Sequence, residues 1–234
     1  HLAAQVAVTT SVKNPLEDFE INALGTFNLL ESVRANCPDT FVLFASTNKV
    51  YGGLETLHVS DTGLSYALTD FPHGIPETLT LDFHSPYGCS KGAADQYVID
   101  YARIYGLRTV SFRQSCIYGY RQFGQEDQGW VAWFTIASLF EKPITFFGNG
   151  KQARDILFVE DLVDAYNSAF TNQNRVVGKS YNIGGGPRNV LSLLQLMDRL
   201  KKSLDKDIPY NIAQVRAGDQ KVFVCDIRRA ANDF

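Results

Sequence analysis

Cysteine is scarce in this sequence, and its positions are informative. The 234 residues include four cysteines, which are widely separated at positions 37, 89, 116 and 225. No two of them have CxxC spacing, and none stands in a cysteine and histidine cluster with the spacing of a zinc site. We therefore expect no metal site and no disulfide framework, and we interpret the cysteines as reduced thiols of a cytoplasmic protein.

Long apolar runs and an excess of positive charge are also missing. No apolar stretch reaches the roughly 20 residues that span a bilayer, and no charged segment followed by an apolar one opens the chain. The formal net charge is -3 and the sequence pI is about 5.8, which leaves no basic surplus for neutralising a phosphate backbone. We therefore expect neither a membrane nor a nucleic acid as a partner.

The sequence does contain an alternation of helical and strand-like segments. Residues 39–46 form a mostly apolar run typical of a buried parallel strand, and residues 107–113 form another. Residues 18–35 have apolar positions close to helical spacing, and residues 86–105 begin with a proline and end before a glycine. Helix, strand, helix and strand in this order predict an α/β fold with a doubly wound parallel sheet.

The pattern changes after about residue 120, where we expect a smaller α/β region. Its predicted helices cover residues 130–140, 159–170 and 192–204, and its predicted strands cover residues 143–147 and 179–183. Neither an internal repeat nor a low-complexity linker separates this region from the first one.

Tyr87 and Lys91 stand four residues apart just inside the predicted helix 86–105, so their side chains leave the same face one turn apart. A phenol has an ordinary pKa of about 10, but a nearby lysine ammonium and a helix N-terminus favour the phenolate and lower this pKa. Such a phenolate can take a proton from a hydroxyl while hydride leaves the same carbon. The two residues alone are also compatible with an ordinary solvated helix face.

Thr47 lies where the predicted strand 39–46 ends, at the sheet edge where open α/β sheets bind ligands. A hydroxyl at this edge can share a proton that is being moved. A Ser or Thr after a strand is, however, more often a local turn or cap. The catalytic interpretation therefore depends on the combination of the strand, this hydroxyl and the later pair of Tyr87 and Lys91.

Seven short segments along the chain carry a family resemblance. They are HLAA at 1–4, Asn22 with GT at 25–26 and LLE at 29–31, ASTNKVYG at 45–52, SPYGCSK at 85–91, Arg113 with IYG at 117–119 and RQ at 121–122, GNG at 148–150 with RD at 154–155, and Arg216 with DQ at 219–220. In these segments and their order the sequence resembles the extended short-chain dehydrogenases that act on nucleotide sugars, the NAD-dependent epimerase/dehydratase family. The resemblance implies a Rossmann-like fold, tightly bound NAD and a nucleotide-sugar substrate.

The resemblance also implies roles for individual residues. Tyr87 would be the acid and base, Lys91 would hold the nicotinamide ribose, and Thr47 would bond the reacting sugar. The implied contacts of NAD are Leu2, Ala3, Ala4, Asn22, Ala45, Ser46, Tyr87, Lys91 and Ser115. The implied contacts of the substrate are Thr47, Cys116, Gln128, Arg154, Arg216 and Asp219.

Several of these and neighbouring residues have a plain structural alternative. Arg154 and Arg216 suit the two charges of a diphosphate, because the arginine fork matches phosphate oxygens, but each is also compatible with a surface charge. Asp219 can bond a ribose hydroxyl or be an ordinary loop residue. Trp130 can shape the pocket or belong to the core, and His84 can act as a second base or be a structural or surface histidine.

The implied domain organisation is incomplete at its start. Residues 1–119 would be the remainder of the NAD-binding Rossmann-like domain, to which residues 153–186 partly return, and residues 120–234 would mainly bind the nucleotide sugar. The family's GxxGxxG loop, whose amides hold the pyrophosphate, is absent, and the chain begins at His1 rather than Met. We therefore expect an N-terminally truncated fragment that binds NAD weakly by itself. Cys116 also departs from the Asn that relatives often have, which removes one expected nucleotide contact.

The residues beside Thr47 indicate the type of reaction. Dehydratases of the family place Asp and Glu after the catalytic Thr, whereas Asn48 and Lys49 follow it here and cannot serve as that acid pair. Epimerisation with NAD as a bound catalyst is therefore favoured. The members that invert C2 of a CDP-linked sugar are the most similar, in the stretches 46–52, 81–97 and 127–130. Epimerisation at C4 of a UDP-sugar and non-catalytic binding are the alternatives.

An assembly is also expected. The predicted helices 18–35 and 86–105 would pair with their counterparts in a second copy across a twofold axis, giving a homo-oligomer. Composition and spacing do not fix the number of copies.

Overall fold

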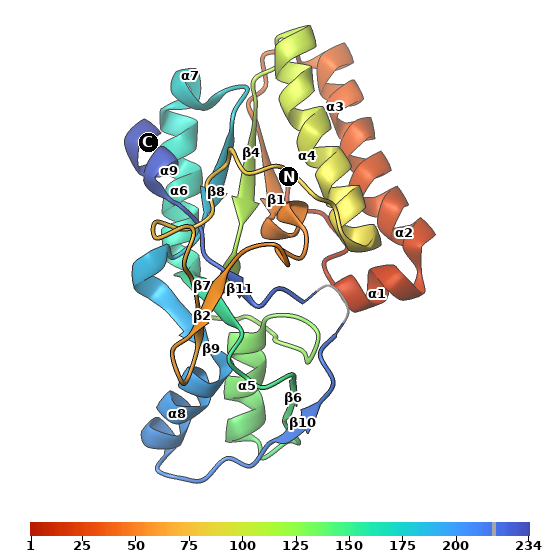
Figure 1. Ribbon diagram of the computed structural model, residues 1–234. Coiled ribbons are helices and arrows are strands. Elements are labelled where there is room, and N and C mark those ends of the chain that lie inside the picture. Colours follow the sequence, from red (N-terminus) through yellow and green to blue (C-terminus); the bar gives the residue numbers. More distant parts are fainter. Residues whose placement is uncertain (217–218) are drawn as a thin grey trace.

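The computed structural model describes residues 1–216 and 219–234. At its centre lie three parallel strands in the order β1 (Val42–Thr47), β4 (Thr109–Gln114) and β8 (Ser180–Ile183), as Figure 1 shows. Five of the six residues of β4 are buried, because a central parallel strand is covered on both faces. The predicted strands 39–46, 107–113 and 179–183 are therefore confirmed, with bounds shifted by one to three residues.

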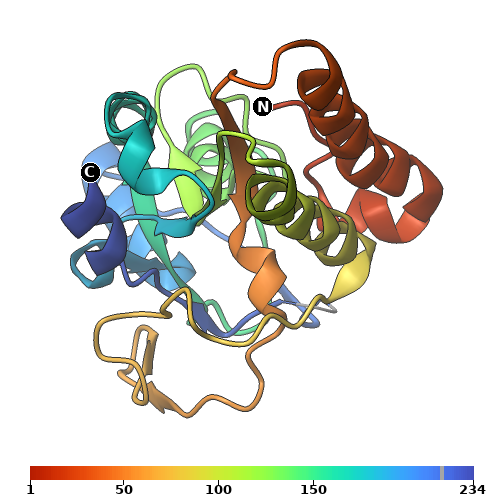
Figure 2. The same ribbon diagram turned by 90° about the horizontal axis from the view of Figure 1, so that it is seen from above.

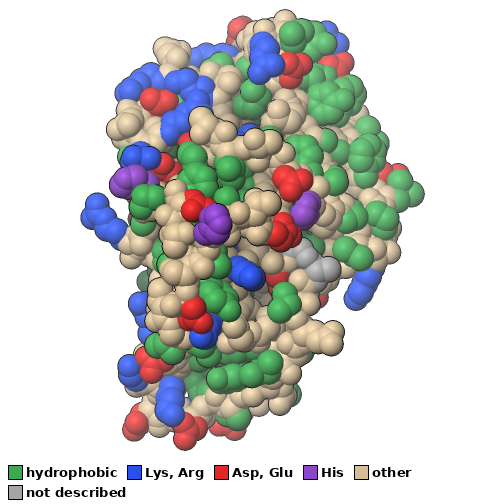
Figure 3. Space-filling model, in the orientation of Figure 1, with side chains coloured by type: hydrophobic (Ala, Val, Ile, Leu, Met, Phe, Trp, Pro, Cys, Tyr) green, Lys and Arg blue, Asp and Glu red, His purple; other side chains and the backbone are tan. Residues whose placement is uncertain are grey.

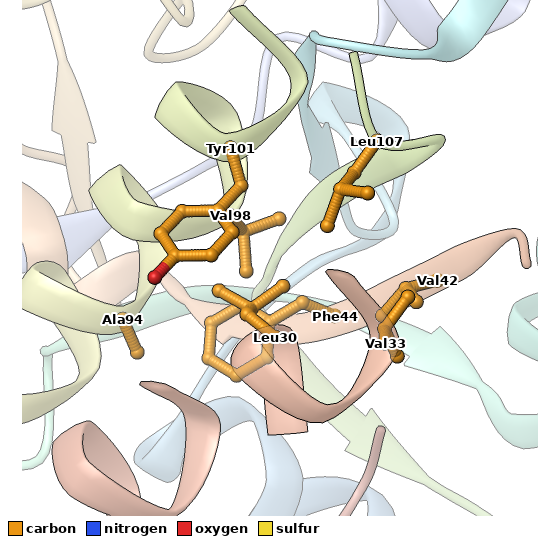
Figure 4. Packing of buried hydrophobic residues seen from close by; sticks show 8 residues of the cluster. All are labelled: Leu30, Val33, Val42, Phe44, Ala94, Val98, Tyr101 and Leu107. Atoms are coloured by element: carbon orange, nitrogen blue, oxygen red, sulfur yellow. The ribbon is translucent and has the colours of Figure 1, made fainter. Parts of the chain in front are cut away.

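Helices cover both faces of this sheet. α3 (Gly25–Asn36) and α4 (Ser85–Tyr105) lie on one face, and α6 (Val159–Thr171) with the short α9 (Arg228–Asp233) lies on the other (Figures 1 and 2). The first face buries the side chains drawn in Figure 4, which are Leu30, Val33, Val42, Phe44, Ala94, Val98, Tyr101 and Leu107. The second face buries a separate cluster around Val110, Phe112, Leu162, Ala169 and Tyr181. Apolar layers on both faces confirm the doubly wound arrangement.

The helices before β1 differ from the prediction in detail. The predicted helix 18–35 is a continuous run of α2 (Pro15–Phe19), the π-helical turn η1 (Glu20–Leu24) and α3. An additional short helix, α1 (Val8–Lys13), precedes it and was not predicted. Its first residues, Val8, Thr9 and Thr10, are β-branched and have low helix propensity, so tertiary packing decides this helix.

The helix that carries Tyr87 follows the prediction closely. α4 begins at Ser85 with Pro86 in its first turn, and it ends at Gly106, which adopts φ of 70°. A left-handed residue satisfies the last carbonyls of a helix, and glycine adopts this conformation at little cost. The amide of Gly106 donates to the carbonyl of Ala102. The predicted helix 86–105 is therefore confirmed at both ends.

The second region contains two small sheets and two larger helices. One sheet has the order β11 (Val222–Phe223), β7 (Ala153–Phe158) and β5 (Cys116–Tyr118), with β9 (Val190–Ser192) antiparallel to β7. The other pairs β6 (Thr145–Phe147) with β10 (Asn211–Ala213). α5 (Trp130–Leu139) and α8 (Leu193–Leu204) pack around a shared core that includes Phe134, Phe146, Leu196 and Met197. The predicted helices 130–140 and 192–204 and the predicted strand 143–147 are therefore present in this region, although β7 was not predicted. The predicted helix 159–170 and strand 179–183 belong to the central sheet instead.

The remaining elements are short. η2 (Asn48–Tyr51) follows β1, β2 (Val59–Asp61) and β3 (Tyr66–Leu68) form an antiparallel hairpin, and α7 (Gln173–Val176) and η3 (Pro187–Asn189) are single turns. Ser192 caps α8, since its hydroxyl accepts from the amide of Gln195 at 3.1 Å. Among the described helices, none has both the length and the apolar character needed to cross a bilayer.

Candidate active site

The structure brings Thr47 and Tyr87 together at the carboxyl end of β1. Thr47 is the last residue of this strand, and Tyr87 lies in the first turn of α4; both side chains are buried. The Thr47 hydroxyl also accepts from the amide of Lys49 at 3.2 Å and so caps η2. Thr47 therefore both caps η2 and forms a hydrogen bond with the side chain of Tyr87.

Lys91 lies on the same face of α4, one turn after Tyr87. Its side chain is buried, its Nζ donates to the carbonyl of Ala45 at 2.6 Å, and the ammonium lies 4.2 Å from the centre of the Phe44 ring. Burial lowers the pKa of Lys91 to about 8, while the charges of Asp95 and Asp18 oppose this shift. The lysine therefore reaches the end of β1 from α4.

The pKa of Tyr87 shifts in the opposite direction from the prediction. Burial raises it to about 12, the hydrogen bond with Thr47 opposes this rise, and the charge of Asp18 adds to it. The spacing in the sequence shows the nearby ammonium of Lys91, but it does not show the loss of water around the phenol, which has the larger effect on this pKa. In the chain alone, Tyr87 is therefore held in its protonated form at neutral pH.

The surroundings of Lys91 fit a nicotinamide ribose. Among the described residues, the Ala45 carbonyl is the single hydrogen-bond acceptor of Nζ, so two N–H groups are available to the hydroxyls of a ribose. The segment that would pass the nicotinamide runs along β1, because the His1 carbonyl accepts from the amide of Ala45 at 3.2 Å. Leu2 and Ala3 are exposed and Ala4 is half-buried, which leaves this segment accessible to a ligand.

Asn22 holds that segment in place. Its side-chain oxygen accepts from the amide of Gln5 at 3.0 Å, and its Nδ2 donates to the carbonyl of Gln5 at 3.0 Å. Asn22 is only 1% exposed, so its observed contacts are with protein. Its contact with NAD, and those of Ala45 and the buried Ser46, stay predictions.

Ser115 lies between β4 and β5. Its hydroxyl donates to Asp155 Oδ1 at 2.5 Å, and its amide donates to the carbonyl of Ile183 at 2.9 Å. The same Asp155 carboxylate accepts from the amides of Gly186 and Cys225 through its other oxygen. In the structure Ser115 therefore joins the two regions, and its contact with NAD stays a prediction.

A cavity of about 250 Å³ lies between α1, the segment before α5 and the segment before β11. Tyr87 and Lys91 are not part of its lining among the described residues. Five of the six residues expected to bind substrate line it: Cys116, Gln128, Arg154, Arg216 and Asp219. Thr47, the sixth, is not part of the lining among the described residues, but Lys49, whose amide it caps, is. The structure therefore gathers residues that are more than 100 positions apart into one site.

Three cationic side chains line the cavity. Arg154 is anchored through Nη2, which donates to the carbonyl of Gln220 at 2.6 Å. Arg216 lies with its guanidinium carbon 3.6 Å from the centre of the Phe147 ring and forms an ion pair with Asp127 at 2.8 Å. Burial lowers the pKa of Lys49 to about 8, and the charge of Arg154 adds to this. Glu126, Asp127 and Asp219 line the same cavity, so its charge is mixed, and the two arginines are the side chains whose geometry suits a diphosphate.

Lys49 and Asp127 were not predicted as members of the site. In the sequence, Lys49 bears only on elimination, and Asp127 is only part of a matching stretch. The position of Lys49, two residues after Thr47, was a usable signal, because the backbone turns at η2 and directs the chain to the cavity. No local pattern could have paired Asp127 with Arg216, since 88 residues lie between them.

Trp130 and His84 differ in their position relative to the cavity. Trp130 lines the cavity, packs against Phe134 of the core, and donates through Nε1 to Cys116 Sγ at 3.3 Å. It therefore combines both expected roles. His84 lies 3.1 Å from Asp82, is 41% exposed and does not line the cavity within the described part of the chain, which favours the surface interpretation.

A known protein family matches most of the chain. Residues 1–184 match the NAD dependent epimerase/dehydratase family. The chain belongs to this family. The family resemblance seen in the sequence is thereby confirmed, and with it the NAD dependence and the Rossmann-like fold.

Individual relatives are similar over almost the whole chain. CDP-paratose 2-epimerase of Salmonella typhi is 51% identical over 99% of this chain and 70% of its own length. The crystal structure of UDP-glucose 4-epimerase from Thermotoga maritima with UDP-glucose has a TM-score of 0.81 and 30% identity over 99% of this chain and 69% of that one. The crystal structure of the Thermus thermophilus UDP-glucose 4-epimerase with NAD has a TM-score of 0.79 and 29% identity, and the match covers 99% of this chain and 70% of that one.

Proposed function

We propose that the protein is a nucleotide-sugar epimerase that inverts C2 of CDP-paratose to form CDP-tyvelose, using tightly bound NAD. The observation that carries this proposal is the meeting of Thr47, Tyr87 and Lys91 at the end of β1, where Thr47 caps the turn that brings Lys49 to a cavity with three cationic side chains. The identity of 51% with a CDP-paratose 2-epimerase supports the choice of C2 and of CDP. The relatives that act at C4 of UDP-glucose, at about 30% identity, support the alternative substrate.

In the proposed mechanism, Tyr87 exchanges a proton with the hydroxyl on the reacting carbon, and Thr47 shares that proton. When bound, NAD would accept a hydride from this carbon and return it to the opposite face, and its positive ring would favour the phenolate. The raised pKa of Tyr87 favours the form that returns the proton to the ketone oxygen. Lys91 would hold the ribose through the N–H groups that it does not donate to Ala45.

The substrate would bind with its diphosphate against Arg154 and Arg216. Both line the cavity, and a planar guanidinium binds phosphate oxygens in pairs. Asp219 lies at the same cavity and would accept from a ribose hydroxyl, while Gln128 and Cys116 would contact the nucleotide or the sugar. Asn48 and Lys49 follow Thr47 in place of two carboxylic acids, so epimerisation is favoured over elimination of water.

The organisation of the whole protein is part of the proposal. Residues 1–119, with a partial return at residues 153–186, would bind NAD, and residues 120–234 would mainly bind the nucleotide sugar. β8 pairs with β4 in the central sheet, which supports the return. The free thiols of all four cysteines support a cytoplasmic location.

We also propose a homo-oligomer formed through the helix pair. Leu16 and Phe19 of α2 and Tyr97 and Ile104 of α4 are 44–65% exposed. Figure 3 shows hydrophobic side chains gathered over these helices and α3. Apolar side chains that cluster on one face of a protein favour association with another surface.

The proposed reaction is tested by incubating the full chain with CDP-paratose and, separately, with UDP-glucose, and following the products by NMR. We expect CDP-tyvelose from the first and no product from the second. Product from UDP-glucose alone would support the C4 alternative. Product from neither, with NAD bound, would favour a non-catalytic binding protein, against which the retained Thr47, Tyr87 and Lys91 argue.

A further inference from the structure

Asp18 is a buried carboxylate that the proposed mechanism does not use. It lies in α2 and is 0% exposed. Ser90 Oγ donates to its Oδ2 at 2.5 Å, and Gln5 Nε2 and Asn22 Nδ2 donate to its Oδ1 at 2.9 and 3.1 Å. One carboxylate therefore joins the N-terminal segment and its own helical run to α4, which lies 72 positions further along the chain.

The hydrogen bonds indicate the charge of Asp18. A carboxylate only accepts, whereas a carboxylic acid must also donate one proton. Gln5 and Asn22 reach Asp18 through amide nitrogens, which only donate, and this fits the ionised form. The Ser90 hydroxyl lies against both Asp18 and the Tyr87 carbonyl, and its proton is directed to Asp18 when that carboxyl is ionised. Burial raises the pKa of Asp18, and the hydrogen bond from Ser90 and the charge of Lys91 oppose this rise. A buried charge needs such compensation.

The neighbours of Asp18 belong to the redox site. Ser90 lies in α4 between Tyr87 and Lys91, and its hydroxyl also accepts from Asn22 Nδ2 at 3.2 Å. Gln5 directly follows the segment His1 to Ala4, and Asn22 bonds the backbone of Gln5 in both directions. Asp18 therefore links the segment expected to pass the nicotinamide with the face of α4 that carries the catalytic pair.

Lys91 is surrounded by few charged groups. Asp95 acts on it from α4 and Asp18 from α2. Asp95 is paired with Arg113 at 2.8 Å and accepts from Ser111 at 2.5 Å. Among the described residues Asp18 has no Lys or Arg at ion-pair distance, so its charge acts on Lys91 without such a competitor.

We propose that Asp18 is a positioning residue of the redox site, which keeps Lys91 in its charged form and holds the His1 to Ala4 segment against α4. The proposal rests on the proposed function only in giving Lys91 a ribose to bind. An ammonium donates three hydrogen bonds, whereas a neutral amine donates two and accepts one. Keeping the charge therefore keeps both free N–H groups of Lys91 available beside Ala45.

The test measures the titration of Lys91 by NMR in the full chain without NAD or substrate, through the Cε resonance of isotope-labelled lysine. The resonance is assigned by its loss in Lys91→Met. Asp18→Asn retains the size and an acceptor oxygen but removes the charge. Ser90→Ala, the matched control, keeps the Asp18 carboxyl group in place and removes one of its hydrogen bonds.

We expect the titration of Lys91 to move to lower pH in Asp18→Asn, to stay close to that of the parent in Ser90→Ala, and to return toward the parent in Asp18→Glu. An unchanged titration in a folded Asp18→Asn protein would overturn the proposal, because a purely structural role would lower the melting temperature alone. If Asp18→Asn does not fold, the carboxyl carbon of Asp18 in the parent decides: ionised at neutral pH supports the proposal, and protonated overturns it.

This experiment does not depend on which sugar is converted. Failure to convert CDP-paratose would overturn the proposed substrate and leave the Lys91 titration intact. An unchanged titration together with turnover of CDP-paratose would overturn the role of Asp18 and leave the proposed reaction intact.

Discussion

Arg216 forms an ion pair with Asp127, with Nη1 2.8 Å from Oδ1, and both side chains line the cavity. The other oxygen of Asp127 accepts from the Thr9 hydroxyl at 2.9 Å. Asp127 therefore connects α1, the segment before α5 and the segment before β11. Because Arg216 is proposed to bind the diphosphate, a carboxylate of the protein already occupies part of the place that a phosphate would take.

We expect Asp127→Asn to bind CDP more tightly than the parent, because the diphosphate no longer competes with a carboxylate for Arg216. A partly exposed ion pair is worth about 0.5 to 1 kcal/mol, or about two- to fivefold in Kd. Calorimetry measures the affinity. Thr9→Val is the control, since it removes the other contact of Asp127 and leaves the ion pair. Equal or weaker binding of CDP by Asp127→Asn would contradict this competition.

We expect Tyr87→Phe to lower turnover by about 10²-fold or more, the usual scale of general acid and base catalysis. The ring still packs in its buried position and only the oxygen that exchanges the proton is lost. NAD should stay bound, as its absorbance in the purified protein will show. Turnover within a few fold of the parent would rule out Tyr87 as the proton-exchanging group.

The pKa of Lys91, lowered to about 8, predicts a pH dependence. The charged form is present below this pH and is lost as the pH rises through it, so kcat/KM should fall on the basic side. Lys91→Arg stays charged at these pH values, so the basic limb should move upward while a lower rate remains. The measurement is a pH profile of kcat/KM for the full chain.

Lys49 provides the control for this profile, because its pKa is also lowered to about 8. Lys49→Arg should leave the basic limb where it is in the parent. If the limb moves in Lys49→Arg and stays in Lys91→Arg, it belongs to the cavity lysine and the assignment to Lys91 is wrong.

We expect Ile104→Glu to weaken self-association of the full chain, because it places a charge on the exposed apolar face of α4, where Ile104 is 62% exposed. Val163→Glu on α6, where Val163 is 48% exposed, is the matched control on the other side of the sheet. Sedimentation velocity measures the size of each variant. Dissociation by Val163→Glu alone would place the interface on α6 instead.

The sequence by itself determined the features that depend on neighbouring residues. The proline and glycine at the ends of α4 set its limits, because their backbone preferences are local. Within that helix, the spacing of Tyr87 and Lys91 places them on one face. The apolar runs of β1 and β4 made a buried parallel sheet predictable, and the ordered motifs were enough to identify the family.

Tertiary structure alone decided what depends on burial and on distant contacts. The pKa of Tyr87 rises because water is excluded from the phenol, and a count of nearby charges in the sequence does not include that effect. Asp18 meets Ser90, and Asp127 meets Arg216, only when strands and helices from separate parts of the chain pack together. These partners have no fixed spacing in the sequence, because long-range contacts are set by the packing of whole elements rather than by local periodicity.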